Sequence, residues 1–594
     1  MSGDVVSLYR ARTARETGTI YKDWGGKRSI ALVYPNRYDL GMSNLGFQVV
    51  YGLLNKRSDV VAERVFLPDR QEMPLYVRSG RPLLSLESQS PLSRFDMVCF
   101  SISFENDYPH VLQILDLGRI PVLAAKRKAE DPFVMAGGVT TFLNPEPLAD
   151  FMDFFLLGEA EANLDLFLNA LFEIMDAGLE RKEALYALGG RLDSLYAPAL
   201  YEPGYQEGGS LRSLTPSGPD VPEKIRPARV LPAEYAREPA ARSVVVTPDT
   251  EFKDRMLVEL GRGCGRSCRF CAAGYVYRPP RTRGEDDLVK SVGEALDQCR
   301  HLGLVSAAVS DVPGLDKAVS LIMERGGDFS VSSLRADSIT PGLLARLKEA
   351  GQRTIALAPE AGSERMRAVI NKHLSREKIE EAVRMIAEAG DFSIRLYFLI
   401  GLPTEESRDV REIVDLTKRI RHHMIKFSRS RGTIGQIRIS LNCFVPKPFT
   451  PFQWVPLEDT RSLKDKQKRI KKALAREGGI RVSTDLPKWA YLQTLLSMGD
   501  RRVGKILLKA HEEQGNWQRA FRSSEVNPDF FVYRPKGLEE VLPWDHIDHG
   551  IRKAHLVREY KMALKAEESA CCLVGECFRC GVCVDPEGAE PGSR

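Results

Sequence analysis

Three cysteines near the middle of the chain have the spacing of a metal-cluster loop. Cys264, Cys268 and Cys271 follow one another as C-x3-C-x2-C within the stretch LGRGCGRSCRFCAAG. Three thiolates can hold three irons of a cubane and leave the fourth iron open, whereas structural zinc sites and closed iron–sulfur sites use four protein ligands. The spacing therefore predicts a cluster with one position free for a substrate or cofactor.

A second group of cysteines lies near the C-terminus, in CCLVGECFRCGVC. Four of its thiols follow the spacing C-x4-C-x2-C-x2-C, and Cys571 is a spare that could replace the first of them. The four are Cys572, Cys577, Cys580 and Cys583. Four thiolates at short spacing predict a closed metal site. Their compactness within one loop favours a second [4Fe–4S] cluster over zinc, and a redox-sensitive tail without metal is the remaining alternative.

Length, composition and net charge limit the class of protein that this sequence can encode. A chain of 594 residues is too long for one core, so we expect about three to four domains. The N-terminus is polar and no stretch approaches the roughly 20 apolar residues of a membrane span, so we expect a cytoplasmic protein without membrane contact. In that compartment clustered cysteines indicate metal binding more often than disulfides. A net charge of +5 neither requires nor excludes a nucleic-acid partner. The scattered Cys99, Cys299 and Cys443 are expected to be ordinary buried thiols.

Residues 28–190 alternate between strand and helix patterns, after an N-terminal extension at 1–27. SIALVYP, FDMVCFSISF, PFVMAGG and DFFLLGEAEANL are predicted strands, and NLGFQVVYGLLNK, capped by Asn44, and YPHVLQILDLG are predicted helices. This pattern predicts a doubly wound, Rossmann-type α/β domain whose ligand lies at the carboxyl ends of the strands. Gly137 and Gly138 would let the backbone approach a large ligand, although a tight turn explains them equally well.

Residues 191–252 are rich in proline and glycine and predict a connector with one hairpin at LYEPGYQEGGSLRSL. From 253 to 456 six strand–helix units follow, beginning with RMLVELGRGC, continuing with LVSAAVS and ending with IRISLNCFVP. Six such units predict a partial (β/α)6 barrel with its chemistry at the carboxyl ends of the strands. One helix of this region has clear punctuation, with Thr340 as N-cap, Pro341 at the first position and Gly351 after the end.

The C-terminal region, 457–566, is predicted to be mainly helical and is followed by the cysteine-rich tail at 567–594. TRSLKDKQKRIKKALAREGG predicts a basic amphipathic helix, which is either a solvated face or an RNA contact. FVPKPFTPFQW, just before it, either caps the open barrel or is a packing loop.

The loop with Phe270 just before its last cysteine, leaving the first strand of a six-unit barrel, resembles that of the radical S-adenosylmethionine (SAM) superfamily. The resemblance implies an enzyme in which Cys264, Cys268 and Cys271 hold a [4Fe–4S] cluster whose open iron chelates the methionine part of SAM. Reduction of the cluster then releases methionine and a 5′-deoxyadenosyl radical that abstracts hydrogen from the substrate. The resemblance also implies an electron donor such as flavodoxin or ferredoxin, and it does not supply the substrate, which could be a small molecule, RNA or protein.

Further positions are carried over from this resemblance as SAM contacts. Ser310 and Asp311 would meet the methionine amine, although Asp311 could also be a surface charge. Ser332 and Arg335 fall where ribose and carboxylate contacts are expected. Glu360 suits ribose hydroxyls, with a salt bridge to an arginine (Arg365 or Arg335) as its alternative. Gly401 would lie close to the adenine. Arginines around the loop could balance the cluster charge, and most of them are expected to be solvated: Arg262, Arg266, Arg269, Arg278, Arg281 and Arg283.

The N-terminal domain resembles the cobalamin-binding domain that precedes many radical SAM barrels, on the ordered set AGG, NPEPLADF and LLGEAEANL. It departs from the better-known form because the Asp-x-His-x-x-Gly element is absent and its only histidine, His110, lies in a predicted helix. Cobalamin bound without a histidine ligand and loss of the cofactor both stay open.

Over nearly its full length the chain is similar to an uncharacterised bacterial family of radical SAM proteins with a cobalamin-binding-like domain and a cysteine-rich end. Methyl transfer or rearrangement would follow if cobalamin binds. The alternative is a non-catalytic iron–sulfur protein that binds RNA or a ribosomal partner.

Overall fold

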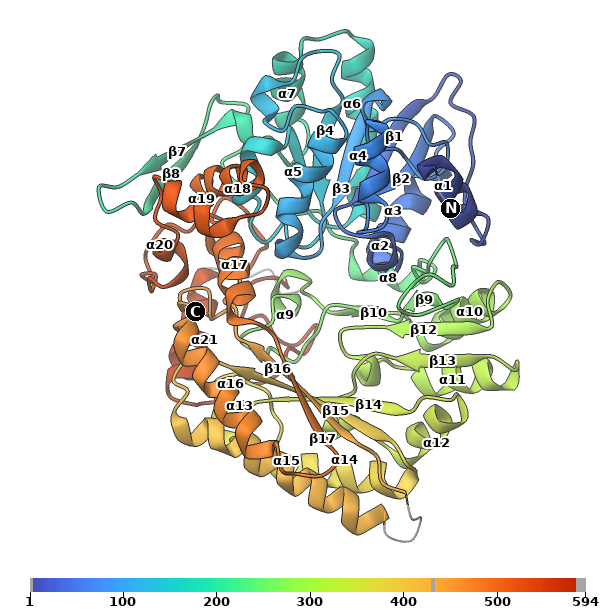
Figure 1. The fold of residues 1–594 in the computed structure, drawn as a ribbon, viewed down its shortest axis with the longest axis vertical. Coiled ribbons are helices and arrows are strands. Elements are labelled where there is room, and N and C mark those ends of the chain that lie inside the picture. The colour runs from blue at the N-terminus through green and yellow to red at the C-terminus, as the bar shows by residue number, and fades with distance from the viewer. Residues whose placement is uncertain (1–3, 429–432, 584–594) are drawn as a thin grey trace.

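The computed structural model describes residues 4–428 and 433–583. Figure 1 shows an α/β domain at the N-terminus, an open fan of barrel strands below it, and C-terminal helices that run back along both. Among the described residues, no helix is long and apolar enough to cross a membrane.

The N-terminal domain is built on one sheet with the order β2-β1-β3-β4-β5-β6. Its parallel strands are β1 (Arg28–Tyr34), β2 (Val60–Phe66), β3 (Met97–Ser101), β4 (Phe133–Gly137) and β5 (Phe154–Leu156). The short β6 (Leu195–Tyr196) adds antiparallel to β5, so the sheet extends past the predicted boundary at residue 190. The order 2-1-3-4-5 is doubly wound, as predicted, and its switch point lies between β1 and β3.

Strand β2 was not predicted, because two charged residues interrupt its apolar pattern. Glu63 and Arg64 are buried all the same. The Arg64 guanidinium donates to Glu16 and Glu87, both within 2.6 Å, and Glu63 accepts from Trp24 at 2.8 Å. Paired charges of this kind can be buried within a sheet.

Helices cover both faces of this sheet. The principal ones are α3 (Leu45–Lys56), α5 (Tyr108–Leu117) and α6 (Ala160–Asp176), accompanied by α1 (Val5–Thr13), α2 (Tyr38–Met42), α4 (Met73–Ser79) and α7 (Arg181–Gly189). Asn44 caps α3 as predicted, accepting a hydrogen bond from the Phe47 amide at 2.9 Å. This cap fixes the start of α3 beside the carboxyl ends of β1 and β3.

The connector contains the predicted hairpin, formed by β7 (Tyr201–Tyr205) and β8 (Leu211–Pro216), and the short helix α8 (Pro232–Arg237). The barrel strands that follow form two parallel groups. One has the order β13-β12-β9, with β9 (Met256–Glu259), β12 (His301–Val305) and β13 (Asp328–Val331). The other is β14 (Thr354–Glu360), β15 (Ser393–Ile400), β16 (Ile437–Cys443) and β17 (Ile480–Thr484).

A parallel bridge between Leu334 and Leu357 joins the two groups into one partial barrel. Two details differ from the prediction. The second strand ends at Val305, so most of the segment LVSAAVS is the loop after it. Strand β17 pairs in parallel with β16 as a seventh strand, so the barrel continues beyond residue 456.

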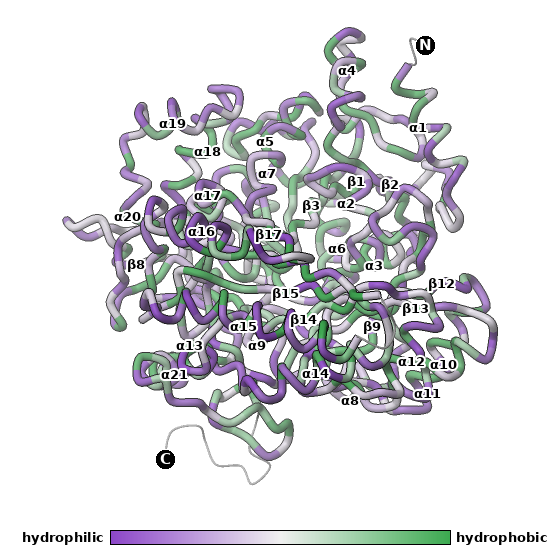
Figure 2. Tube along the Cα trace, turned by 60° about the horizontal axis from the view of Figure 1, so that its bottom comes forward, coloured by the Kyte–Doolittle hydropathy of each residue, from purple (hydrophilic) through white to green (hydrophobic). Residues whose placement is uncertain are grey.

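The outer layer of the barrel consists of amphipathic helices. They are α10 (Glu285–Leu296), α11 (Leu315–Glu324), α12 (Pro341–Glu349), α13 (Glu364–Val369), α14 (Arg376–Ala389), α15 (Ser407–Ser428) and α16 (Thr460–Leu474). Thr340 caps α12 as predicted, accepting from the Leu343 amide at 3.2 Å. The basic helix α16 buries Leu463, Ile470 and Leu474, and most of its lysines and arginines face outward. Figure 2 shows this layering, with hydrophobic residues toward the centre and hydrophilic ones on outer helices such as α14.

The segment FVPKPFTPFQW is a packing loop, since Phe444, Phe452 and Trp454 are all buried. Beyond the barrel lie α17 (Pro487–Met498), α18 (Arg502–Glu512), α19 (Trp517–Ser523), α20 (Asp529–Val532) and α21 (Lys553–Leu564). Helices α17 and α18 reach the N-terminal domain (Figure 1). Arg501, just before α18, donates to Glu146 at 3.1 Å and to the Tyr196 hydroxyl at 2.8 Å. This ion pair joins the first and last thirds of the chain.

The Arg501–Glu146 pair predicts a stability difference between two variants. Arg501→Met leaves the Glu146 carboxylate buried and unpaired, so we expect the chain to lose about 3 kcal/mol of stability. Lys509→Met is the matched control on α18, because the Lys509–Glu512 pair is exposed and contributes little. Denaturant unfolding followed by tryptophan fluorescence measures both variants. Equal midpoints for the two would contradict a supporting role for the buried pair.

Candidate active site

The cysteine loop begins where β9 ends. It passes through the short strand β10 (Gly261–Arg262), turns, enters α9 (Ala273–Val276) and returns as β11 (Arg281–Thr282), which pairs antiparallel with β10. Gly263 has φ +81°, and a Cβ there would lie 2.6 Å from the Tyr277 carbonyl oxygen, so the turn before Cys264 requires glycine.

The three thiols of this loop line one cavity of about 190 Å³. The opposite wall comes from the carboxyl ends of the barrel strands, as expected for this architecture. The predicted residues that line it besides the cysteines are Arg266, Phe270, Ser310, Arg335 and Glu360. The structure therefore brings together residues that are almost 100 positions apart in the sequence.

Burial changes the pKa of two of the three thiols. Burial raises the pKa of the Cys268 thiol to about 12, and burial likewise raises the pKa of Cys271. Bound iron would replace these protons. Within residues 4–428 and 433–583, no three Cys, His, Asp or Glu side chains converge as ligands of a single ion. A cubane does not require such convergence, because each thiolate binds a different iron.

A carboxylate and an ammonium group form an ion pair in the wall of this cavity. Lys372 Nζ lies 3.2 Å from Glu360 Oε1, so the partner of Glu360 is a lysine and not Arg365 or Arg335. Burial raises the pKa of Glu360, and Lys372 opposes this shift. Glu360 has φ +64°, an unfavourable conformation for a residue with a side chain, as found at many functional sites. Sequence reasoning missed Lys372, which follows a short helix and carries no motif.

Three predicted SAM contacts lie elsewhere. Asp311 is outside the lining, and its carboxylate pairs with Arg266 at 2.5 Å on the rim. Ser332 does not line the cavity, whereas its neighbour Ser333 does. Gly401 faces α16, since a Cβ there would lie 2.8 Å from the Leu463 side chain. Its φ of +81° serves the turn after β15.

The expectation that most arginines near the loop are solvated is wrong. The buried ones are Arg269, Arg278, Arg281 and Arg283. Arg281 pairs with Glu159 at 2.5 Å, and Arg262 pairs with Glu161 at 2.7 Å. Both glutamates belong to LLGEAEANL of the N-terminal domain, so these ion pairs join that domain to the cysteine loop.

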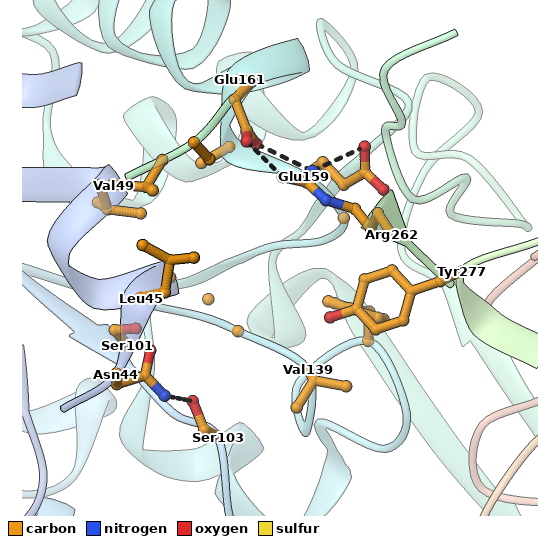
Figure 3. A pocket seen from close by; sticks show the side chains of 18 of the residues that line it. Asn44, Leu45, Val49, Ser101, Ser103, Val139, Glu159, Glu161, Arg262 and Tyr277 are labelled. Carbon is orange, nitrogen blue, oxygen red and sulfur yellow. Dashed lines mark hydrogen bonds and ion pairs between the residues drawn. The ribbon is translucent and has the colours of Figure 1, made fainter. Parts of the chain in front are cut away.

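A second cavity, of about 460 Å³, lies between the N-terminal domain and the barrel. Figure 3 shows Leu45, Val49 and Val139 on its apolar walls, with Arg262 and Tyr277 contributed by the cysteine-loop region. Gly137 and Gly138 line it at the end of β4. Gly138 has φ +103°, and a Cβ there would lie 2.4 Å from the Ile102 carbonyl oxygen, so a side chain would push the backbone away from the cavity edge.

One polar atom beside this cavity has no protein partner. Asn163 lines the cavity, and its Nδ2 donates to the Leu157 carbonyl oxygen at 3.1 Å. Its Oδ1 is buried and accepts no hydrogen bond among the described residues. Such an acceptor calls for a donor from a bound molecule or water. The described lining residues include no histidine, and His110 lies on α5 with its Nδ1 2.9 Å from the Pro35 carbonyl oxygen.

The two cavities are neighbours. Ala307 lines both, Ala273 lines the larger one and Gly274 lines the smaller one. Ala307 lies in the loop after β12. A ligand in the larger cavity would therefore lie next to a ligand held at the cysteines.

The four tail cysteines lie outside both linings, beside the outer side of the cysteine loop. The Cys572 amide donates to the Gly265 carbonyl oxygen at 2.7 Å. The hydrogen bond to Asp311 is the main cause that raises the pKa of Arg266, and the charge of Cys571, the predicted spare, adds to this shift.

Comparison with known families identifies the superfamily. Residues 258–417, which contain the whole cysteine loop, match the family described as Radical SAM superfamily, and residues 46–198 match Radical SAM proteins, N-terminal. The chain belongs to the radical SAM superfamily. It is a radical SAM enzyme, and its superfamily implies a [4Fe–4S] cluster and SAM.

Several relatives are similar to this radical SAM enzyme. The uncharacterized protein MJ0966 of Methanocaldococcus jannaschii is 28% identical over 483 residues, which cover 81% of this chain and 90% of that protein. A tRNA-2-methylthio-N(6)-dimethylallyladenosine synthase of Petrotoga mobilis is 24% identical over 29% of this chain and 43% of its own length. Among solved structures, the methyltransferase TsrM of Kitasatospora setae superposes with TM-score 0.47 at 12% identity, covering 84% of this chain and 100% of that chain.

The Glu360–Lys372 pair in the small cavity predicts that removing the charge of Glu360 weakens SAM binding. Glu360→Gln keeps the shape but removes the charge that strengthens a hydrogen bond to a hydroxyl, so we expect the Kd for SAM to rise about tenfold. Isothermal titration of the reconstituted protein measures it. Glu349→Gln, on the outer side of α12, is the matched control. Unchanged affinity in Glu360→Gln would remove Glu360 from the SAM site.

Proposed function

We propose that this protein is a cobalamin-dependent radical SAM enzyme, with cobalamin in the 460 Å³ cavity and SAM in the 190 Å³ cavity. The observation that carries the proposal is that the two cavities meet at Ala307. Two ligands that must exchange a group or an electron need such proximity.

The lining of the larger cavity supports a large ring-shaped ligand with a polar rim. Leu45, Val49 and Val139 offer apolar surface to the ring, and Gly137 and Gly138 lie at the carboxyl edge of the sheet, where ligands of doubly wound folds bind. The unpartnered Asn163 Oδ1 would accept a hydrogen bond from a peripheral amide of the corrin. Since the described lining has no histidine, no histidine would reach the cobalt from this cavity wall.

The residues of the small cavity would bind and orient SAM. Cys264, Cys268 and Cys271 would hold the cluster, which supplies the electron that cleaves SAM. Lys372, which is paired with Glu360 and lines the same cavity as the three thiols, would pair with the SAM carboxylate, and Glu360 would accept from the ribose hydroxyls. Phe270 covers one side and helps exclude water. Ser310 and Arg335 line the same cavity and would make further contacts with SAM.

We propose methyl transfer as the outcome, since the SAM methyl group is the group that a cobalt ion can carry from one cavity to a substrate. The electron would come from a donor of the flavodoxin or ferredoxin type. The reducing cytoplasm is the compartment in which such thiols stay available to iron.

Cobalamin binding is tested with a variant that fills the cavity. Val49→Trp places a ring in the space, so we expect it to abolish binding of hydroxocobalamin, followed by absorption spectroscopy after anaerobic gel filtration. Leu166→Trp is the control, because Leu166 is 59% exposed on α6 and away from the cavity. Iron content and SAM cleavage should persist in both variants.

A wild-type protein whose spectrum lacks the absorption bands of cobalamin, or a Val49→Trp variant that binds as much cobalamin as wild type, would overturn the proposal. Methyl-labelled SAM separates the outcomes. Label recovered with the extracted cobalamin supports methyl transfer, and its absence beside 5′-deoxyadenosine formation indicates rearrangement.

A further inference from the structure

The cysteine-rich tail is attached to the SAM-binding loop at three points, all made by residues of that loop. Arg269, between Cys268 and Phe270, is fully buried and donates to the Glu567 carbonyl oxygen at 2.8 Å and to Glu559 of α21 at 3.2 Å. The Cys572 amide donates to the Gly265 carbonyl oxygen. A Cβ on Gly265 would lie 2.9 Å from the Cys572 carbonyl oxygen, so only glycine permits this approach.

Arg278 makes the third attachment. Its Nη2 donates to Ser267 Oγ at 2.9 Å and its Nε to the Gly274 carbonyl oxygen at 2.7 Å, on either side of Cys268 and Cys271. Its Nη1 forms a hydrogen bond with His555 Nε2 of α21 at 3.4 Å, and the Cys580 thiol lies close enough for its charge to act on the guanidinium. One buried cation therefore contacts the cysteine loop and α21 and lies near a thiol of the tail.

The tail folds so that its four thiols share one small region. Cys572, Cys577, Cys580 and Cys583 lie near enough for their charges to act on one another, whereas the charge of Cys571 acts on Arg266. Gly575 and Gly581 take φ of +84° and +91°, which allows the tight turns between the cysteines. The Arg552 amide donates to the Cys580 carbonyl oxygen at 2.9 Å and fixes the loop against α21.

The donor set fits a closed cluster. Arg579 Nε donates to the Cys577 sulfur at 3.3 Å, and hydrogen bonds to sulfur of this kind tune iron–sulfur clusters. The thiols do not converge as ligands of one ion within the described part of the chain, and a cubane does not require such convergence, because each thiolate binds a different iron. Leu573 and Val574, at the tip of the loop, are 57% and 48% exposed, so an external donor can approach from this side.

We propose that Cys572, Cys577, Cys580 and Cys583 hold a second [4Fe–4S] cluster that relays single electrons to the cluster at Cys264, Cys268 and Cys271. The tail cluster is oxidised by one electron as the SAM-binding cluster is reduced by one. A low-potential one-electron donor protein, carrying a flavin or an iron–sulfur cluster, replaces that electron, and no proton needs to move. Arg278 favours the reduced, more negative form of either cluster. The inference rests on the radical SAM chemistry and not on cobalamin.

Metal analysis and electron paramagnetic resonance of the full-length, anaerobically reconstituted protein test this relay. We expect wild type to hold about eight irons per chain and the double variant Cys577→Ala/Cys580→Ala about half of that. The dithionite-reduced wild-type spectrum should show broadening from two interacting spins, which the double variant loses while its remaining signal still shifts on addition of SAM. Cys571→Ala is the matched control and should keep both clusters.

A kinetic readout addresses the direction of electron flow. With a flavodoxin and its reductase as the donor, the double variant should lose most 5′-deoxyadenosine formation, whereas dithionite, a small reductant, should restore it. Zinc in the tail, full iron in the double variant, two clusters without spin interaction, or undiminished flavodoxin-driven turnover would each overturn the proposal. The wild-type metal content and spectrum decide the site even if the double variant does not fold.

Discussion

Two buried guanidinium groups hold the cysteine loop in place, and the remaining structure is arranged around them. Arg269 donates to a backbone carbonyl of α13, to the Glu559 carboxylate of α21 and to a backbone carbonyl of the tail, and Arg278 donates to Ser267 and Gly274 within the loop. A buried charge needs several partners, and breaking such a set is costly. A thiolate-ligated cluster adds negative charge at this place, so buried cations stabilise the loaded site as well as the fold. The C-terminal helix α21 and the tail are therefore part of the support for the cysteine loop.

The position of the N-terminal domain follows from the same principle. Arg262 and Arg281 flank the loop and pair with Glu161 and Glu159, which stand at the carboxyl edge of the doubly wound sheet. Both architectures place their ligands at the carboxyl ends of their strands. These ion pairs hold the two edges against each other, and Ala307 lines both of the cavities that lie there. The meeting of two ligand sites is thus a consequence of how the two domains are joined.

Local sequence signals predicted what depends on neighbouring residues. The spacing of Cys264, Cys268 and Cys271 led to the cavity, and the Asn44 and Thr340 caps lie where the helix patterns placed them. Both domain architectures were also predictable, because buried parallel strands leave apolar runs in the sequence. These features required no knowledge of distant segments.

Features that depend on contacts between distant segments were missed. Strand β2 contains charges that only the fold pairs, and β17 gains its place by docking on β16. Lys372 and Asn163 become functional candidates only when a cavity forms beside them. Conversely, Gly401 was chosen because it follows a strand in a loop motif, and in the structure the glycine allows the turn after β15 and the close contact with α16.

We propose that the three-cysteine loop leaves one iron open for the amine and carboxylate of SAM. Electron–nuclear double resonance on the reduced protein, with SAM labelled with nitrogen-15 at the amine and oxygen-17 at the carboxylate, tests it most directly. The account predicts that both labels couple to the cluster spin in wild type and that neither coupling is seen in Cys268→Ala. A cluster signal in wild type that shows no coupling to either label would contradict it.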